Sequence, residues 1–444
     1  MKQVIEKAKR GVIPSKKLQH EKSKIAKLAF DSIRKQVPKF PQILEVEFGG
    51  SYAKGTWLPD IGDLDIFLKF KESTPKKKFV EIAKKVGFDA MKKFKPYVRY
   101  AEHPYVEAHI KGTRVNVVPC YDVQKGKWQS AADRSPFHTA FMLESLTGTM
   151  KNDVRLLKSF LKNNDVYGAE IAKQGFSGYV AEVLIWNFSS FENVIKKIAK
   201  IKQNQVIGQA SKKFETPIVI MDPIDDNRNL AAAISTENIG KFVLACREFL
   251  KKPSSLFFKP KVKVDSKKNL KNVLVVKFNY KPRSPDTIWG QIKRAASTLA
   301  VQMKIEGFKV LRNGAAADDQ KEACLFFVLQ SLEIEKDMIK EGPDFFSESD
   351  SEKFITKNSK KSKIMWINNN GKILALQKRQ NNDAKVFLRD LLKNNINSSG
   401  IPKGLKNDLR KNFKIIPGNR VLNKSIKKAL LDLVSTDATI FSSN

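Results

Sequence analysis

Cysteine is scarce in this chain of 444 residues, which contains only three. Cys120, Cys246 and Cys324 are far apart, and each lies in an apolar run. Their spacing matches no metal-ligand pattern, and an odd number argues against a framework of disulfides. We therefore expect three buried thiols in a protein of a reducing compartment.

Long apolar runs are missing as well. No stretch approaches the roughly 20 apolar residues that a helix needs to cross a bilayer. The N-terminal segment MKQVIEKAKRGVIPSKKLQ is basic but lacks the apolar core of a secretion signal. The sequence therefore predicts no membrane association and a cytoplasmic location.

Acidic residues are too few to balance the basic ones. The chain has 46 Asp and Glu against 82 Lys and Arg, so its formal net charge is +36, and lysine clusters occur along its whole length. This balance indicates a polyanionic partner, usually nucleic acid. A solvated lysine-rich surface is the alternative. At about 150 residues per domain the length suggests roughly two to four domains, without a clean internal repeat.

The most informative motif is a Gly-Ser turn followed by two acidic residues. Gly50 and Ser51 precede Asp63 and Asp65, which lie in an apolar strand pattern. Side chains two apart in a strand share a face, so both aspartates should point the same way. Paired carboxylates suit Mg²⁺, and the turn offers N–H groups and a hydroxyl to phosphate. Either half alone is common, but together they predict a nucleotidyl-transfer site with two metal ions.

Hydrophobic periodicity predicts a compact N-terminal α/β unit. Helices are expected over 17–36 and 77–94. Strands are expected over four segments, the last two paired as a hairpin: 43–48, 63–69, 105–110 and 114–118. This mixture is typical of a small catalytic domain built on one sheet.

Helices dominate from residue 152 onward, and strands return later. Asn152 and Asp153 are expected to cap a helix to about residue 163, and Ser177 to cap another. The remaining segments are predicted as follows: a helix over 237–251, strands between 256 and 281, a helix over 288–305, an apolar segment over 323–332, and a loop or linker over 344–363.

Ordered blocks of sequence make a more specific match. Besides the Gly-Ser turn and the aspartate pair, they are RYAEHPY (99–105), VVPCY (117–121), DRSPFH (133–138), VRLLK (154–158), YGAE (167–170), GFSGY (175–179), DPIDDNRN (222–229), CREF (246–249) and FFKP (257–260). With these blocks the chain resembles the archaeal-type (class I) CCA-adding enzymes, tRNA nucleotidyltransferases of the polymerase-β-like superfamily. Beyond residue 260 the resemblance is one of layout.

The resemblance implies an α+β multidomain fold: a polymerase-β-like nucleotidyltransferase head with a mixed sheet, a helical neck, and an α/β body and tail. The implied boundaries are 1–150 for the head, 151–255 for the neck, 256–343 for the body, and 344–444 for the tail with C-terminal body elements. Such enzymes add C, C and A to the tRNA 3′ end from CTP and ATP, with Mg²⁺ and without a nucleic-acid template. The implied partner is the tRNA acceptor arm, and the oligomeric state stays open, a homodimer included.

The resemblance also assigns residues that would hold the nucleotide. Gly50, Ser51 and Lys54 would contact its phosphates, with Lys54 standing where the family often has Arg, so that a point charge replaces a bidentate contact. The triphosphate or sugar would also be held by His138, Lys158 and Tyr167. A fourth residue, Arg228, would lie near the nucleotide base and phosphate. Taken singly, each of these four also fits a structural role: a helix-start or core histidine, a solvated helix lysine, a loop filler and an ion pair.

One residue departs from the family pattern. Asn116 stands where the family usually has a third carboxylate beside Asp63 and Asp65, so these three are the implied catalytic and metal-binding residues. An amide oxygen can coordinate Mg²⁺, but it is neutral and accepts no proton. Glu107 and Asp122 are near in sequence, but neither is at the expected strand position. A compensated natural change, an engineered inactivation, and retained RNA binding with weak catalysis all stay open.

Two other functions fit part of the pattern. A poly(A)- or oligo(A)-type polymerase shares the Gly-Ser turn and the aspartate pair but lacks the downstream blocks. A tRNA-end binding module whose chemistry has decayed at Asn116 would keep the basic surface and lose the reaction. The order of CTP and ATP use separates the first of these from CCA addition, and restoration of activity by Asn116→Asp would identify the second.

Overall fold

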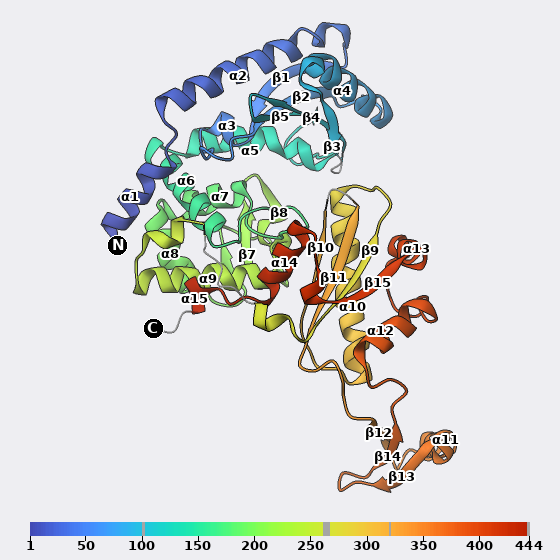
Figure 1. Ribbon diagram of the computed structural model, residues 1–444. Helices are drawn as coiled ribbons and strands as arrows, with labels where there is room; N and C mark the ends of the chain where they lie inside the picture. Colours follow the sequence, from blue (N-terminus) through green and yellow to red (C-terminus); the bar gives the residue numbers. More distant parts are fainter. Residues whose placement is uncertain (100–102, 261–266, 319–320, 442–444) are drawn as a thin grey trace. The chain divides into compact units, whose positions relative to one another are not determined.

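The computed structural model describes residues 1–99, 103–260, 267–318 and 321–441 (Figure 1). Residues 100–102 of the RYAEHPY block lie outside the described part. The chain divides into two compact units, residues 1–263 together with 437–444, and residues 264–436. None of the described helices combines the length and the apolar character that a bilayer crossing requires. All three cysteines are free and buried, as predicted.

A five-stranded mixed sheet organises the first unit, in the order β1-β2-β5-β4-β3. Its strands are β1 (Ile43–Gly49), β2 (Leu64–Lys71), β3 (Tyr97–Arg99), β4 (Tyr105–Ile110) and β5 (Thr113–Asp122). Only β2 and β5 pair in parallel. The predicted strands and the predicted hairpin are confirmed. Three of the strands agree within about two residues, whereas β5 continues four residues beyond its predicted end at 118, and Asp63 comes just before β2 rather than within it.

Helices α2 (Lys16–Arg34) and α4 (Lys76–Met91) cover one face of this sheet, as Figure 1 shows. Both helices were predicted, α2 from an apolar stripe. Leu64, Ile66 and Leu68 enter the shared core with Ile25 and Ala83. Because strand side chains alternate, the intervening Asp65 projects from the opposite face. The short helix α3 (Gly50–Lys54) and helix α5 (Arg134–Ser145) lie beside that face.

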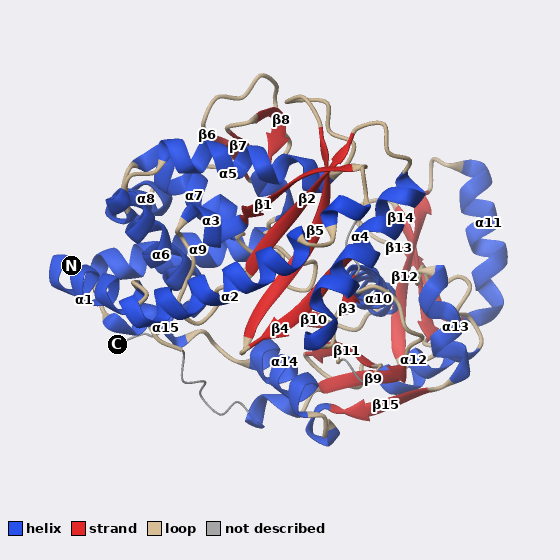
Figure 2. Cartoon of the chain, turned by 90° about the horizontal axis from the view of Figure 1, so that it is seen from above, coloured by secondary structure: helices blue, strands red, loops and turns tan. Residues whose placement is uncertain are grey.

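The rest of the first unit is mainly helical, and Figure 2 shows it as a cluster of helices. It contains α1 (Lys2–Val12), α6 (Gly148–Asn163), α7 (Gly178–Phe188), α8 (Phe191–Ala199), α9 (Thr236–Lys251) and α15 (Ala438–Phe441), with a small sheet of β6 (Gln205–Ile207), β7 (Ile218–Asp222) and β8 (Asp225–Asn229). Phenylalanines such as Phe160, Phe242 and Phe249 fill its core. The predicted cap at Ser177 is confirmed: its hydroxyl accepts a hydrogen bond from the backbone N–H of Val180 at 3.0 Å, at the start of α7.

The cap predicted at Asn152 and Asp153 is wrong. Helix α6 begins four residues earlier, where the hydroxyl of Thr147 accepts from the N–H of Met150 at 3.3 Å. Asp153 is instead paired with Lys9 of α1 at 2.8 Å. Threonine is also a favoured N-cap residue, since its hydroxyl can accept from a free N–H group of the first turn. The cap therefore lies at Thr147, and Asp153 contacts another helix.

The second unit is built on an antiparallel sheet in the order β10-β11-β9-β15. The strands are β9 (Val273–Asn279), β10 (Val310–Ala317), β11 (Glu322–Leu329) and β15 (Phe413–Pro417). One face packs on α10 (Pro285–Glu306), α12 (Ala384–Lys393) and α13 (Lys403–Lys411), and the other on α14 (Lys424–Val434). The predicted strand at 273–278 and helix at 288–305 are confirmed.

A second, three-stranded sheet follows, and it overturns the predicted loop over 344–363. Its order is β12-β14-β13, with β12 (Asp337–Asp344), β13 (Ser362–Ile367) and β14 (Lys372–Lys378), and α11 (Glu348–Asn358) lies between the first two in sequence. Because most residues of this helix are polar, the sequence has no apolar periodicity that would predict it. Its last residue Asn358 is 1% exposed and accepts hydrogen bonds from Lys340 at 3.2 Å and Gln377 at 3.0 Å. Polar contacts, more than an apolar stripe, hold it to the sheet.

Candidate active site

The Gly-Ser turn brings backbone and carboxylate together at the end of β1. Gly50 has φ +62°, and a Cβ at this position would lie 2.0 Å from Oδ2 of Asp65. Only glycine therefore allows the Asp65 carboxylate to approach the start of α3 so closely. Ser51 follows in the same short helix, where its carbonyl accepts from the N–H of Thr56.

Asp65 and Asn116 lie side by side because β2 and β5 are parallel and in register at these two residues. Nδ2 of Asn116 donates to Oδ1 of Asp65 at 2.8 Å. Burial raises the pKa of Asp65, and the nearby charge of Asp63 raises it further. Asp63 forms an ion pair with Arg114, which shares the face of Asn116. The structure thus brings the three predicted residues together near the start of β2, on two interior strands of the sheet.

The donors of this group fit a hard divalent cation. Asp63 and Asp65 provide carboxylate oxygens, and Oδ1 of Asn116 is buried without a hydrogen-bond partner in the described part of the chain. Such an orphaned oxygen is costly unless something satisfies it, and carbonyl oxygens are ordinary ligands of Mg²⁺ and Ca²⁺. Among the described residues, no group of three His, Cys, Asp or Glu side chains is placed to hold a metal ion. At this site the third donor is an amide.

Glu107 lies on β4 directly opposite Asn116. It is 1% exposed. Its carboxylate accepts from the hydroxyl of Tyr97 and from Nε of Arg99 at 3.3 Å. These bonds commit Glu107 to β3, the edge strand. Asp122 lies at the far end of β5, 3.2 Å from Lys69, so neither carboxylate takes the strand position of Asn116.

A second group surrounds the buried carboxylate of Glu182 on α7. Oε1 of Glu182 lies 2.9 Å from Nζ of Lys158 on α6, and it also accepts from the hydroxyl of Thr56. Oε2 forms an ion pair with Lys54 of α3. Although burial opposes ionisation, the charges of Lys158 and Lys54 lower the pKa of Glu182 to about 2. Burial lowers the pKa of Lys158.

Tyr167 belongs to this second group. A Cβ at Gly178 would lie 3.0 Å from its hydroxyl and 3.4 Å from Nζ of Lys158. Burial raises the pKa of Tyr167, so its hydroxyl is neutral and can donate at physiological pH.

A third group surrounds Asp222 at the end of β7. Its carboxylate lies 3.0 Å from Nε2 of His138, 3.0 Å from Nη1 of Arg228 and 2.9 Å from the hydroxyl of Tyr179. The His138 ring stacks on Tyr179 with a centroid distance of 3.8 Å. Burial lowers the pKa of His138, which favours the neutral imidazole. Although burial opposes it, hydrogen bonding to His138 contributes to a lowered pKa of Asp222.

Contacts join the three groups within the first unit. Nζ of Lys54 lies 5.4 Å from the ring centroid of Tyr179, and the charge of Lys54 also acts on Asp65. Sequence reasoning did not assign Glu182, Asp222 or Tyr179 to the site. Asp222 and Tyr179 lie within blocks that carry the family resemblance. The signal for Glu182 was its charge inside an otherwise apolar helix, Val180 to Ile185.

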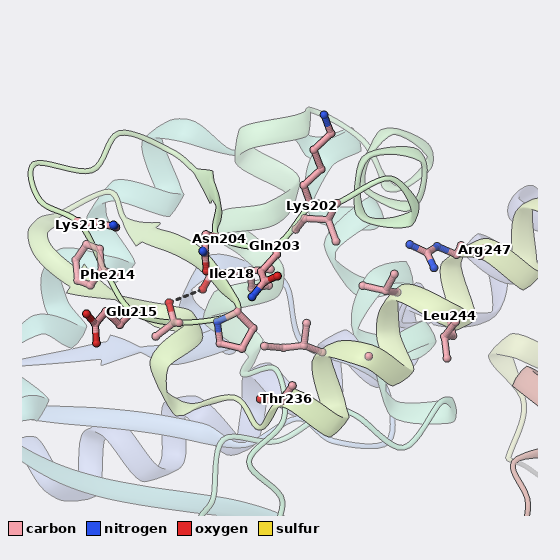
Figure 3. Close-up of a pocket in the computed structure, with 16 residues that line it drawn as sticks. Lys202, Gln203, Asn204, Lys213, Phe214, Glu215, Ile218, Thr236, Leu244 and Arg247 are labelled. Atoms are coloured by element: carbon pink, nitrogen blue, oxygen red, sulfur yellow. Dashed lines mark hydrogen bonds between the residues drawn. The ribbon is translucent and has the colours of Figure 1, made fainter. Parts of the chain in front are cut away.

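A cavity of 770 Å³ lies elsewhere in the first unit, between α9 and the segment 201–218. Figure 3 shows Lys202, Lys213 and Arg247 around it, with Phe214 and Leu244 among its apolar lining. None of the residues predicted for the nucleotide or metal site lines this cavity. The candidate site is therefore defined by its polar groups and not by this cavity.

Three family models match this chain. A nucleotidyltransferase domain covers residues 30–138, the second domain of tRNA nucleotidyltransferase covers 152–259, and the C-terminal domain of CCA-adding enzyme covers 271–418. Together they span both units of the chain.

Curated relatives carry the same name. A CCA-adding enzyme of Archaeoglobus fulgidus is 32% identical over 98% of this chain and 99% of its own length. The CCA-adding enzyme of Pyrobaculum neutrophilum is 38% identical over 68% of this chain and 73% of its own length. That of Saccharolobus islandicus is 35% identical over 78% of this chain and 83% of its own length. Among solved structures, the Cid1 RNA terminal uridylyl transferase aligns over 58% of this chain and 98% of its own chain. The sequence identity is 12% and the TM-score is 0.46.

Proposed function

The chain belongs to the family of CCA-adding enzymes, the tRNA nucleotidyltransferases, and from that premise we propose how its own residues perform the reaction. The enzyme adds C, C and A to the tRNA 3′ end without a nucleic-acid template. In each step the terminal 3′-oxygen bonds to the α-phosphorus of the nucleotide, the bond to pyrophosphate breaks, and the hydroxyl loses its proton. The nucleotides are CTP and ATP, and the tRNA enters by its acceptor arm.

Asp63, Asp65 and Asn116 would hold Mg²⁺, which when bound polarises the phosphoryl oxygens and lowers the pKa of the attacking hydroxyl. The observation that carries this assignment is the unpartnered Oδ1 of Asn116 beside the Asp65 carboxylate. Because the Asn116 amide is neutral, it can orient but cannot take the proton of the primer hydroxyl. We therefore expect slow chemistry relative to an enzyme with three carboxylates.

Gly50 and Ser51 present the N-terminal end of α3 to the phosphates, and Lys54 and Lys158 add positive charge behind it. Tyr167 donates from the same side. His138 and Arg228 hold the base or sugar from the Asp222 group. This division separates the residues that grip the charged triphosphate from those that meet the nucleoside.

A basic surface for the tRNA backbone is available in the second unit. A cavity of 630 Å³ is lined by six cations and no carboxylate: Lys385, Arg389, Lys393, Arg410, Lys411 and Lys414. All six are exposed, and none forms an ion pair with a carboxylate of the described residues. Unpaired cations of this density favour a phosphate backbone.

We also propose the four domains named above as functional divisions: the head (1–150), the neck (151–255), the body (256–343) and the tail with C-terminal body elements (344–444). The cytoplasmic location stays a prediction, and the oligomeric state stays open. A second function, a tRNA-end binding module with decayed catalysis, is favoured by one observation, the neutral amide of Asn116.

The test is addition to a tRNA that lacks its 3′ CCA, with labelled CTP and then ATP in the presence of Mg²⁺. We expect incorporation of two C residues and then one A. Incorporation of A before C on a tRNA ending at its discriminator base would instead identify a poly(A)-type enzyme. Tight tRNA binding without incorporation, with activity restored by Asn116→Asp, would identify the binding module.

A further inference from the structure

Glu182 is a single buried carboxylate shared by two lysines from different helices. Its side chain is 1% exposed, and the side chains of Lys54 and Lys158 are 7% and 2% exposed. Lys158 also lies 3.1 Å from the hydroxyl of Thr56 and 3.2 Å from its carbonyl. Glu182 therefore ties the turn that follows β1 to helices α6 and α7.

The charges in this group do not balance. Two ammonium groups share one carboxylate, so a net positive charge is buried, and unpaired buried charge is costly. Among the other groups that act on it, Arg155 is a further cation, and burial keeps the phenols Tyr167 and Tyr179 neutral by raising the pKa of each. The charge of Lys54 also acts on Asp65, a carboxylate that the proposed function assigns to Mg²⁺. An anionic ligand would supply the missing negative charge.

We propose that Glu182 is a positioning residue for the nucleotide triphosphate. It stabilises the charged form of Lys158 and fixes the ammonium groups of both lysines while the site is empty, and it does not touch the nucleotide itself. The triphosphate then meets two oriented cations that carry more positive charge than Glu182 neutralises. This inference rests on the proposed phosphate-binding roles of Lys54 and Lys158.

The test is Glu182→Gln, which keeps the volume and removes the charge. We expect the KM for CTP and its dissociation constant by calorimetry to rise roughly 10- to 100-fold, the range of one or two charge-assisted hydrogen bonds. The kcat at saturating CTP should change little. Because Lys158 then loses its proton more easily, the KM of the variant should rise further from about pH 7 to about pH 9, while that of the wild type stays flat.

Two further variants keep the result interpretable. Glu192→Gln removes a glutamate that pairs with Lys196 at 2.6 Å on α8, and it should leave the KM unchanged. If Glu182→Gln folds poorly, the double variant Glu182→Gln with Lys158→Met should recover thermal stability, because one buried cation is removed, yet keep a raised KM.

The outcomes also separate this inference from the proposed function. A raised KM in Lys158→Met with a normal KM and a flat pH profile in Glu182→Gln would overturn the role of Glu182 alone. An unchanged KM in Lys54→Met and in Lys158→Met would overturn the proposed phosphate site. A loss of kcat in Glu182→Gln without any change in KM would contradict positioning of the triphosphate.

Discussion

Asn116 is the residue at which this chain differs most from the site that its family implies. It donates to Asp65 with its Nδ2 and leaves its Oδ1 unsatisfied. An aspartate here could not donate, so two carboxylates would face each other across the β2–β5 register. Without a cation that pair is unfavourable, and with one it is a better site. The neutral amide therefore lacks the negative charge that catalysis would use, but it stabilises the folded protein when no metal ion is bound.

We expect Asn116→Asp to raise the rate of CMP addition with saturating Mg²⁺, on the order of 10²-fold, the effect of one catalytic proton acceptor. In EDTA the same variant should lose about 1–3 kcal/mol of stability, because a hydrogen bond becomes a repulsion. Single-turnover incorporation and thermal melts with and without Mg²⁺ measure the two effects.

The control is Asn369→Asp, an exposed change in the turn between β13 and β14 of the second unit, which should alter neither quantity. An Asn116→Asp enzyme that is equally stable in EDTA and no faster in Mg²⁺ would remove residue 116 from the metal site.

At this scale the sequence could predict which residues carry the chemistry but not what holds them. Gly50, Asp65 and Asn116 were identified by motif and resemblance, and the structure places them together. Glu182 and Asp222 were missed, because their importance lies in partners more than a hundred and more than eighty positions away in sequence. The local signals, a charge inside an apolar helix for Glu182 and the DPIDDNRN block for Asp222, do not reveal those partners.

At the scale of the element, the β7–β8 hairpin delivers Arg228 to the site. The carboxylate of Asp222, the last residue of β7, joins the hairpin to its surroundings. It accepts hydrogen bonds from Arg228 on β8, from His138 on α5 and from Tyr179 on α7. One carboxylate thus fixes two helices and a strand against one another. The three short strands β6, β7 and β8 were not predicted, since segments of three to five residues are too short for a clear period.

Replacing Asp222 by Asn should therefore affect both stability and nucleotide binding. The Asp222 carboxylate accepts hydrogen bonds from His138, Tyr179 and Arg228, and loss of its charge weakens them at a cost of about 1–3 kcal/mol. Release of Arg228 should raise the KM for CTP and ATP. Denaturant unfolding and steady-state kinetics measure these effects.

The matched change is Asp226→Asn, an exposed position on the same hairpin, which should be neutral in both assays. A stable Asp222→Asn protein with normal KM values would show that the hairpin is held by its apolar residues alone.

Helix α11 gives the general reason for the errors at this scale. Elements with an apolar stripe, such as α2, α4 and α10, were predicted within a few residues of their observed bounds. Helix α11 is anchored by Ser351 and Asn358 rather than by a stripe. Periodicity detects burial of apolar surface, so an element held by hydrogen bonds is read as a loop.

At the scale of the whole molecule, the net charge of +36 is a statement about partners, not about fold. The charge is informative only where it is organised. Lys385, Arg389 and Lys393 recur every four residues on α12, so they share one helix face. They line a cavity with Arg410 and Lys411 at the end of α13.

The opposite face of the same sheet offers a matched set. Lys424, Lys427 and Lys428 lie on α14, which packs against the other side of the β9–β11 strands. Both sets carry three positive charges within the second unit. If charge alone drew the tRNA, the two sets would contribute equally.

We expect replacement of Lys385, Arg389 and Lys393 by Gln to weaken tRNA binding about tenfold or more near 0.1 M salt, and to lower the slope of log K against log salt by about two to three, since each lost phosphate contact removes about 0.7–0.9. Replacement of the α14 set by Gln should lower that slope by less than about one. Filter binding across a salt series measures both slopes, and the affinity for CTP, unchanged in either variant, reports that the first unit remains folded. An equal loss of tRNA affinity in the two variants would mean that α12 forms no dedicated tRNA surface. In that case the tRNA would respond only to the total positive charge, which is the same on both sides of the sheet.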